Sequence, residues 1–216
     1  MIGFYNYSVI LTYISLASSI FGMMITMNGH YKLAVIFLAI SGLCDMFDGK
    51  IARAMKNRSE DAKKFGIQID SLCDVVCFGI FPVMICYKTG MNSVPGIIFL
   101  TLYAIAGVIR LGYFNVMEEK RQEETDDKRE YYQGLPITSI SVVLPVIYAF
   151  RPLLKENFII CVYVMIISVG VLFVTNFRFK KPHNVTLAAM VAVVSIALIN
   201  TFFFHGHFMG IFHGLK

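Results

Sequence analysis

The chain has few charged residues. Only 15% of its 216 residues are Asp, Glu, Lys or Arg, whereas globular domains contain about 25%. Hydrophobic residues make up 57% of the sequence, and the mean hydropathy is +0.68. The shortage of charge excludes a water-soluble globular domain, and the high apolar content excludes intrinsic disorder.

The five cysteines form no pairing pattern. Their number is odd, the sequence has no Cys-x-x-Cys pair, and all five lie in apolar stretches. We interpret them as small buried hydrophobic residues. The amino end also lacks a basic stretch before its first apolar run and a small-residue cleavage site after it. We therefore expect a retained membrane span there.

Long apolar runs make up most of the chain. An apolar helix of about 18 or more residues can cross a hydrocarbon core of about 30 Å, and the absence of period-2 alternation favours helices over barrel strands. Seven stretches can be marked, at residues 7–27, 31–44, 67–87, 94–117, 137–150, 158–176 and 185–204. The second is short, and we expect it to continue as a helix to residue 55. The sequence predicts an all-α integral membrane protein, a helical bundle of six core spans plus a seventh, forming one domain over residues 1–216.

The basic residues predict the orientation. Thirteen of the 19 Lys and Arg residues lie in the connections 50–64, 118–133 and 178–181, and five lie in the opposite connections. Basic residues prefer the cytoplasmic side of a membrane. We therefore expect a multi-pass protein of the cell membrane whose amino terminus and basic connections face the cytoplasm, with 118–133 as an exposed loop or helix. The net charge of +5 belongs to these connections and does not indicate nucleic-acid binding.

Four carboxylates lie within or beside the apolar runs. Asp45 and Asp48 follow the second run, and Asp70 and Asp74 lie inside the third. A carboxylate at the bilayer centre costs about 2.5–3.5 kcal/mol on insertion scales, so this cluster indicates a functional site. Spacings of three and four residues place each pair on one helical face. The chain returns antiparallel between the two pairs, which lets them face each other.

Converging carboxylates need cations to remain ionised. Oxygen-only ligands suit Mg²⁺ or Mn²⁺, and these ions also bridge phosphate oxygens. We therefore interpret the four aspartates as a site for two divalent metals that holds a pyrophosphate group.

The aspartates belong to a longer motif. It reads Asp45-x2-Asp48-Gly49-x2-Ala52-Arg53-x12-Gly66-x3-Asp70-x3-Asp74. This motif resembles the signature of the CDP-alcohol phosphotransferases, membrane enzymes of phospholipid synthesis, although the gap after Arg53 is longer than is usual in that family. The resemblance implies that Asp45, Asp48 and Asp70 hold both metals and that Asp74 is a partial ligand and the general base. It also implies a homodimer.

The other motif positions suit a CDP-linked lipid. Gly49 and Gly66 have no side chain and Ala52 has a small one, so a nucleotide can approach the helices closely; helix packing is the alternative reason for these residues. Arg53 suits a charge-assisted contact with a diphosphate. By resemblance, Thr12 contacts the nucleotide, with an ordinary hydroxyl inside a span as the alternative.

Three further strings resemble the membrane-embedded phosphatidylserine synthases of this family. They are Asp70-Ser-Leu-Cys-Asp74 with the following Phe78-Gly79 and Pro82, Arg110-Leu-Gly-Tyr-Phe-Asn115, and Gly134-Leu-Pro136. This resemblance implies that CDP-diacylglycerol and L-serine react in the cytoplasmic leaflet to give phosphatidylserine and CMP. Relatives that accept glycerol 3-phosphate tend to carry a proline and a lysine where this chain has Ser71 and Val75.

Arg110 is a fifth charge inside an apolar run. We expect it to meet the acceptor carboxylate or the donor phosphate, with Asn115 hydrogen-bonding the acceptor; an ion pair between Arg110 and an aspartate is the alternative. The acceptor could also be glycerol 3-phosphate or inositol, and the donor an archaeal-type ether lipid. From another class, the four carboxylates could line the cation pathway of a transporter, although Arg53 would repel the ion.

Overall fold

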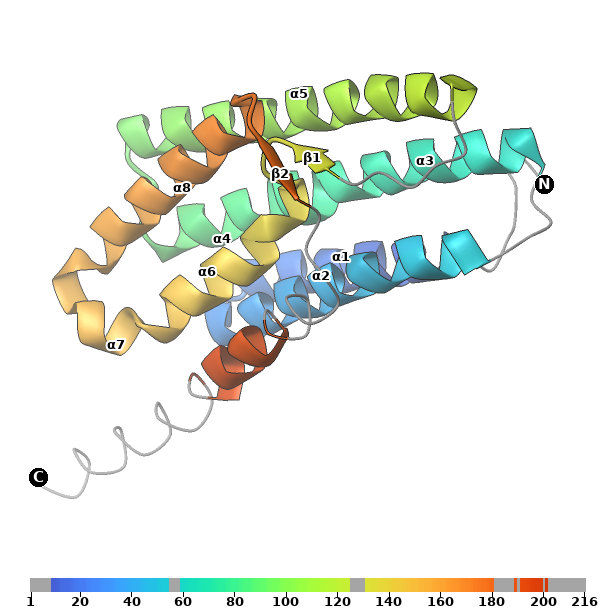
Figure 1. Cartoon of the computed structure of the whole chain (residues 1–216). Helices are drawn as coiled ribbons and strands as arrows, with labels where there is room; N and C mark the ends of the chain where they lie inside the picture. The colour runs from blue at the N-terminus through green and yellow to red at the C-terminus, as the bar shows by residue number, and fades with distance from the viewer. Residues whose placement is uncertain are drawn as a thin grey trace, which may run out of the picture.

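A computed structural model of the chain shows a bundle of long helices (Figure 1). The structure describes residues 9–54, 59–124, 131–180, 189, 191–199 and 201, with the backbone alone at 49–54, 121–124, 131–133 and 178–180. The elements in order are α1 (Ile10–Met27), α2 (Tyr31–Ala54), α3 (Glu60–Asp74), the π-helix η2 (Val75–Ile80), α4 (Phe81–Thr89), α5 (Val94–Glu124), β1 (Tyr131–Gln133), the 3₁₀ turn η3 (Ile137–Ser139), α6 (Ile140–Ala149), α7 (Arg151–Leu154), the 3₁₀ turn η4 (Lys155–Asn157), α8 (Phe158–Val174) and β2 (Arg178–Lys180).

The first two helices form a hairpin held by buried hydroxyl groups. The chain reverses at Gly29, whose φ of +83° is a left-handed conformation that glycine adopts without strain. Between the helices, the Oγ atoms of Ser15 and Ser41 are 2.6 Å apart, and Ser18 donates a hydrogen bond of 3.0 Å to the carbonyl of Phe37. Small polar residues of this kind allow close helix packing in a lipid environment.

α3, η2 and α4 form one continuous helical segment. It begins at Ser59, whose Oγ accepts a hydrogen bond of 3.3 Å from the amide of Ala62, as an N-cap residue does. Directly after Asp74 the segment widens into the π-helix η2. There the carbonyl of Phe78 accepts a hydrogen bond of 2.7 Å from the hydroxyl of Tyr103 on α5. Single-turn π-helices occur frequently at functional sites, and this one adjoins an aspartate of the motif.

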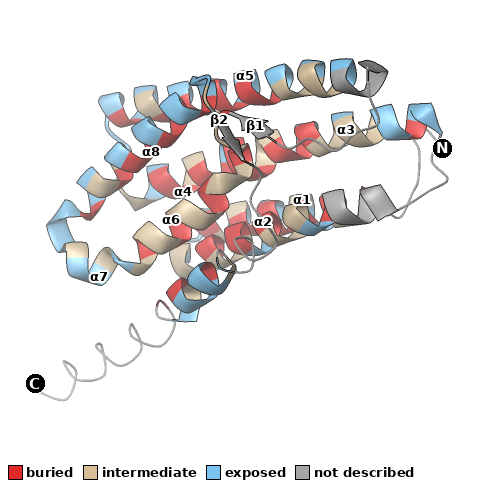
Figure 2. Cartoon of the chain, in the orientation of Figure 1, coloured by how far each residue is buried: buried red, intermediate tan, exposed pale blue. Residues whose placement is uncertain are grey.

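The core lies where α2, the α3–α4 segment, α5, α6 and α8 meet. Its largest fully buried side chains include Leu38, Phe78, Phe81, Tyr103, Ile140 and Ile166. The outward faces are also apolar, as along α5, where Ile98, Leu102, Ile105 and Ile109 are exposed (Figure 2). Continuous exposed apolar surface is rare on soluble monomers and is what lipid tails would cover.

Within the described part of the chain, four helical segments are long and apolar enough to cross a membrane. They are Ile10–Met27, Glu60–Thr89, Val94–Lys120 and Arg151–Val174, with Ile137–Ala149 as a shorter apolar helix. α2 has 24 residues but carries two aspartates, two lysines and an arginine, which makes it less apolar than these four. The predicted extension of the second stretch as a helix is confirmed as far as Ala54. The last predicted stretch, 185–204, is described only at 189, 191–199 and 201, where it is helical. The count of six spans plus a seventh therefore stays a prediction.

Two details differ from the prediction. The all-α class is confirmed, and the one addition to it in the described residues is a short ribbon in which β1 and β2 pair antiparallel, with Tyr131 opposite Lys180. The backbone groups that follow α5 and α8 need hydrogen-bond partners, and this short ribbon supplies them. The third helix also begins earlier than its predicted apolar stretch, at Glu60 instead of residue 67, which shortens the connection after α2.

The contact between α2 and α6 gives a test of the packing. Gly42 lies against Ser141, and an added Cβ at Gly42 would overlap the Ser141 side chain. Gly42→Ala should therefore destabilise the protein by about 1–3 kcal/mol, as overpacking does. At Gly112 on α5, nothing lies within 4 Å of an added Cβ. There the same substitution should stabilise the helix by up to about 1 kcal/mol. Thermal unfolding in detergent would measure both changes, and equal shifts would contradict the packing.

Candidate active site

Two helices bring the motif aspartates together. α2 carries Asp45 and Asp48 toward its carboxyl end, and α3 carries Asp70 and its last residue, Asp74. Carboxylate oxygens of Asp45, Asp70 and Asp74 lie within 4.8 Å of one another. The prediction that the two pairs face each other is confirmed, because this group draws on both helices.

Asp48 borders the group of three and joins it to α1. Its side chain is only 6% exposed, and its Oδ2 accepts a hydrogen bond of 3.0 Å from Thr12 Oγ1. The carboxyl groups of Asp48 and Asp70 also lie within hydrogen-bonding range of each other. Thr12, predicted as a nucleotide contact, thus lies beside the acidic cluster.

The cluster fits a divalent metal. Among the described side chains, no lysine or arginine forms an ion pair with Asp45, Asp70 or Asp74. Carboxylates crowded together in an apolar bundle repel one another and resist ionisation unless a cation neutralises them. Several carboxylate oxygens at this spacing form the hard, oxygen-only ligand set that Mg²⁺ and Mn²⁺ prefer. The residues can therefore hold such an ion.

α5 reaches the cluster through Asn115. Ser71, the neighbour of Asp70, donates a hydrogen bond of 2.7 Å to Asn115 Oδ1. The amide group of Asn115 keeps two N–H donors beyond this bond. The predicted acceptor residue is therefore next to the aspartates, and Ser71 is the residue that positions it.

The predicted donor-binding residues lie along the same two helices. Gly66 is half-buried on α3, four residues before Asp70 and therefore on the same helical face. Gly49, Ala52 and Arg53 continue α2 beyond the aspartates, and their side chains are outside the described part of the chain.

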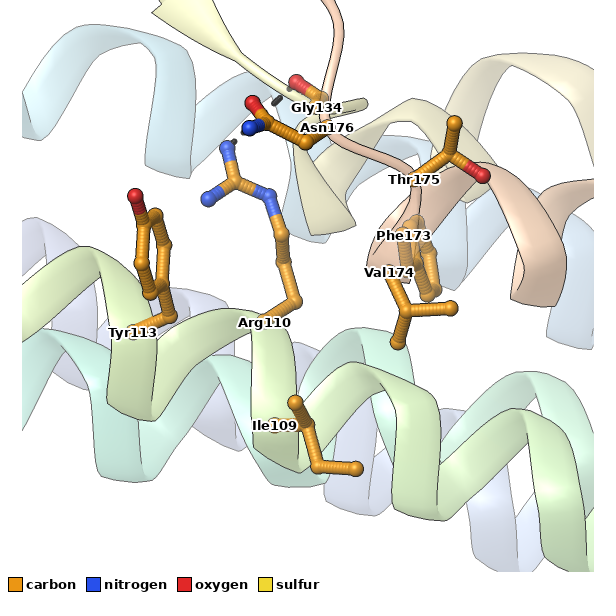
Figure 3. A pocket seen from close by; sticks show the side chains of 8 residues that line it. All are labelled: Ile109, Arg110, Tyr113, Gly134, Phe173, Val174, Thr175 and Asn176. Atoms are coloured by element: carbon orange, nitrogen blue, oxygen red, sulfur yellow. Dashed lines mark hydrogen bonds between the residues drawn. The ribbon is translucent and has the colours of Figure 1, made fainter.

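Arg110 lines a separate cavity of about 200 Å³ and precedes Asn115 by five residues on α5, which places it about 140° around the helix axis from Asn115. Its guanidinium donates hydrogen bonds to the carbonyls of Leu135, at 3.0 Å, and Gly134, at 3.4 Å, and lies 5.8 Å from the ring centroid of Phe114. Figure 3 shows the guanidinium pointing toward the loop that carries Gly134. The cavity is lined by Ile109, Arg110, Tyr113, Gly134, Phe173, Val174, Thr175 and Asn176.

The turn at Gly134 closes this cavity. Its φ of +68° and its closeness to the Thr175 carbonyl, 3.2 Å from where a Cβ would stand, both require glycine. Its amide donates a hydrogen bond of 2.8 Å to the carbonyl of Phe177. The Gly-Leu-Pro string noted in the sequence thus supplies backbone carbonyls to Arg110.

The sequence did not predict the buried network of hydroxyl groups that Ser15, Ser19 and Ser41 form one helical turn from Asp45. Ser41 lies one helical turn before Asp45 and contacts Ser15, while Ser19 donates to Ser41 Oγ at 2.9 Å. Ser15 also lies 3.7 Å from the sulfur of Cys77 in η2. The signal was available in the i, i+4 spacing of Ser41 and Asp45, and in Ser15 and Ser19 following Thr12 on one face of α1.

Comparison with known proteins agrees with the motif. A sequence profile of the CDP-alcohol phosphatidyltransferase family matches residues 5–174. A protein of Helicobacter pylori (strain 26695), named CDP-diacylglycerol–serine O-phosphatidyltransferase, is 32% identical over 213 residues, which cover 91% of this chain and 84% of that protein.

Two further relatives bear the same name. One from Mycobacterium leprae is 25% identical over 198 residues, covering 89% of this chain. One from Saccharomyces cerevisiae is 32% identical over 130 residues, covering 59% of this chain. The matches span 64% of the mycobacterial protein and 46% of the yeast protein. Since the profile covers most of the sequence, and the helices converge on the motif aspartates, the chain belongs to the CDP-alcohol phosphatidyltransferase family.

Proposed function

We propose that this chain transfers a phosphatidyl group from CDP-diacylglycerol to L-serine and releases phosphatidylserine and CMP. The observation that carries the proposal is the meeting of Asp45, Asp70 and Asp74 from two helices, within 4.8 Å of one another. The names of the relatives from H. pylori, M. leprae and yeast support serine as the acceptor.

The four aspartates would hold two divalent ions, Mg²⁺ or Mn²⁺. When bound, these ions would neutralise the pyrophosphate of the donor and stabilise the charge that develops on the transferred phosphoryl group. Thr12 fixes the carboxylate of Asp48 through its hydrogen bond, so α1 helps to hold the ligand set in place. Crowding of like charges keeps the site selective for a dication.

Asp74 acts as the general base. It ends α3, is 9% exposed, and lies beside Asp45. Its carboxylate takes the proton from the serine hydroxyl as the serine oxygen bonds to the lipid-side phosphorus. The bond from that phosphorus to the CMP oxygen breaks, and CMP leaves with the electron pair. Positioned proton transfer of this kind accelerates a reaction by about 10²–10⁴-fold.

The remaining motif residues bind the two substrates. Gly49, Ala52 and Gly66 leave room along α2 and α3 for the cytidine nucleotide, and Arg53 contacts the diphosphate. Asn115, held by Ser71, donates its amide N–H groups to the carboxylate of serine.

Arg110 supports the acceptor side from its own cavity. A guanidinium has five N–H donors, and the carbonyls of Gly134 and Leu135 orient the group. Its positive charge would draw an anionic acceptor group toward this part of α5.

The proposed enzyme works in the cell membrane as a homodimer with six core spans and a seventh. Its aspartates face the cytoplasm, the side to which the 13 basic residues of the three connections are assigned. CDP-linked donors and serine are found on that side.

Release of CMP tests the reaction. The purified full chain in detergent is incubated with CDP-diacylglycerol and Mn²⁺, with serine, glycerol 3-phosphate, inositol or no acceptor. CMP release should depend on serine and stop when a chelator removes the metal. Release with a different alcohol would reject serine but keep the chemistry, and no release with any acceptor from folded protein would reject the enzyme.

Substitution of Asp74 tests the base. Asp74→Asn keeps the size of the side chain and removes its ability to accept the proton, so kcat should fall at least about 100-fold. Binding of CDP-diacylglycerol should change little. Asp61→Asn alters an exposed carboxylate of the same helix and should leave kcat unchanged. Full activity of the Asp74 variant would contradict the assignment.

Metal binding can be measured without turnover. At a metal concentration about 100 times the dissociation constant, binding adds about 2.7 kcal/mol to stability, so Mn²⁺ should raise the unfolding temperature by several degrees. Asp70→Asn should abolish this increase, while its metal-free form is at least as stable as the wild type because one repulsive charge is gone. Asp61→Asn serves as the control that retains the increase. An Mn²⁺ effect that survives Asp70→Asn would place the metal elsewhere.

A further inference from the structure

A second group of charged and aromatic side chains lies at the opposite end of the bundle from the acidic cluster. Lys32 is in the first turn of α2, whereas Asp45 lies 13 residues further along the same helix. At 1.5 Å per residue the two are separated by about 20 Å. Arg151 begins α7, directly after the end of α6.

The packing of α2 against α6 places Lys32 and Arg151 at the same height along the axis of the bundle. The helices run in opposite directions (Figure 1), and Gly42 of α2 lies against Ser141 of α6. Lys32 precedes Gly42 by ten residues, and Arg151 follows Ser141 by ten residues. The two groups lie close enough for their positive charges to repel each other.

The guanidinium of Arg151 is held in place by two aromatic rings. Its central carbon lies 5.6 Å from the ring centroid of Tyr148 and 5.2 Å from that of Phe158. It also donates a hydrogen bond of 3.2 Å to the Tyr148 hydroxyl. The rings themselves pack edge to face, with centroids 6.0 Å apart. Such cation–π contacts orient the guanidinium without neutralising its charge.

No described carboxylate balances these two charges. In the connections at this end, residues 28–30, 90–93 and 150–157, the sole acidic residue is Glu156. Among the described residues, neither Lys32 nor Arg151 forms an ion pair with a carboxylate. Two half-buried cations held together against their repulsion are complementary to an anion.

The surroundings favour a lipid as the source of that anion. Phe150, Leu153, Ile159 and Ile160 are exposed beside Arg151, and apolar surface of this kind suits acyl chains rather than a soluble ion. Tyr, Lys and Arg are the residues found at membrane interfaces, where basic side chains meet anionic headgroups.

We propose that Lys32 and Arg151 bind the phosphate of an anionic phospholipid whose acyl chains lie along the exposed apolar residues of α7 and α8. The site is independent of the proposed enzymatic function. In the orientation given above, it faces the outer leaflet.

Lipid retention by the full chain tests this site. The purified protein is examined by native mass spectrometry with phosphatidylglycerol, with phosphatidylcholine of the same acyl chains, and with inorganic phosphate. Phosphatidylglycerol should bind much more tightly than phosphatidylcholine, and inorganic phosphate at equal concentration should not displace it. The double variant Lys32→Gln, Arg151→Gln should lose roughly 30-fold in affinity for phosphatidylglycerol, since each basic residue near an anionic lipid contributes several-fold.

A matched control lies at the same end of the bundle. Lys88, in the last turn of α4, is exposed, so Lys88→Gln removes the same charge and should keep wild-type affinity. Arg151→Lys, which keeps the charge and loses the planar group, should bind with intermediate affinity. If the double variant does not elute as the wild type does in size exclusion, the single variant Lys32→Gln replaces it and should lose roughly 5-fold.

Four results would each overturn the proposal. They are wild-type affinity in the Lys32 and Arg151 variants, an equal loss in Lys88→Gln, equal binding of the two lipids, and displacement of the lipid by inorganic phosphate. The first three would reduce the two residues to general interfacial anchors. The fourth would show that the site binds a soluble anion and not a lipid.

Discussion

Mutual repulsion among carboxylates is the constraint around which this bundle is arranged. Asp45, Asp70 and Asp74 would separate if their helices were free, yet their oxygens lie within 4.8 Å of one another. The apolar contacts of α2 and the α3–α4 segment with the remaining helices oppose that separation. The core residues Leu38, Phe78 and Phe81 therefore preserve the geometry of the site. The repulsion lowers the free energy of unfolding, and a bound cation would remove this repulsion.

The hydroxyl network also holds helices in the arrangement that the acidic cluster needs. Ser15, Ser19 and Ser41 satisfy one another between α1 and α2, directly along the helices from Thr12 and Asp48. In an apolar environment an unpaired hydroxyl is costly, so these contacts fix the rotation of α1 against α2. The hydrogen bond from Thr12 to Asp48 can then form in one register.

The meeting of the aspartates was predictable from their local spacing. The i, i+3 and i, i+4 pairs of aspartates define helical faces, and their antiparallel return places the faces together. Helices were predictable from apolar length, and the continuation of α2 past Asp45 to Ala54 was predictable because the apolar run 31–44 is short for a span. The β1–β2 ribbon and the contact of Arg110 with Gly134 and Leu135 were not. Both join segments far apart in sequence through hydrogen bonds to backbone groups, and such bonds leave no periodic signal. The basic pair of Lys32 and Arg151 depends in the same way on the register of two helices.

The π-helix η2 has a consequence for helical phase. In a uniform α-helix an additional residue displaces everything beyond it by about 100° around the axis, whereas the wider π turn takes up one additional residue without that rotation. The π turn therefore allows two sets of residues to lie on different faces of one continuous helical segment. They are Asp70 and Asp74 before η2, and Phe81 and Ile85 after it. Wound as a uniform α-helix with every residue kept, the segment would turn one half by about 100° against the other, so that either the carboxylates or the aromatic core would face the lipid. The π turn thus lets one continuous membrane helix direct its aspartates to the acidic cluster and its later apolar side chains to the core.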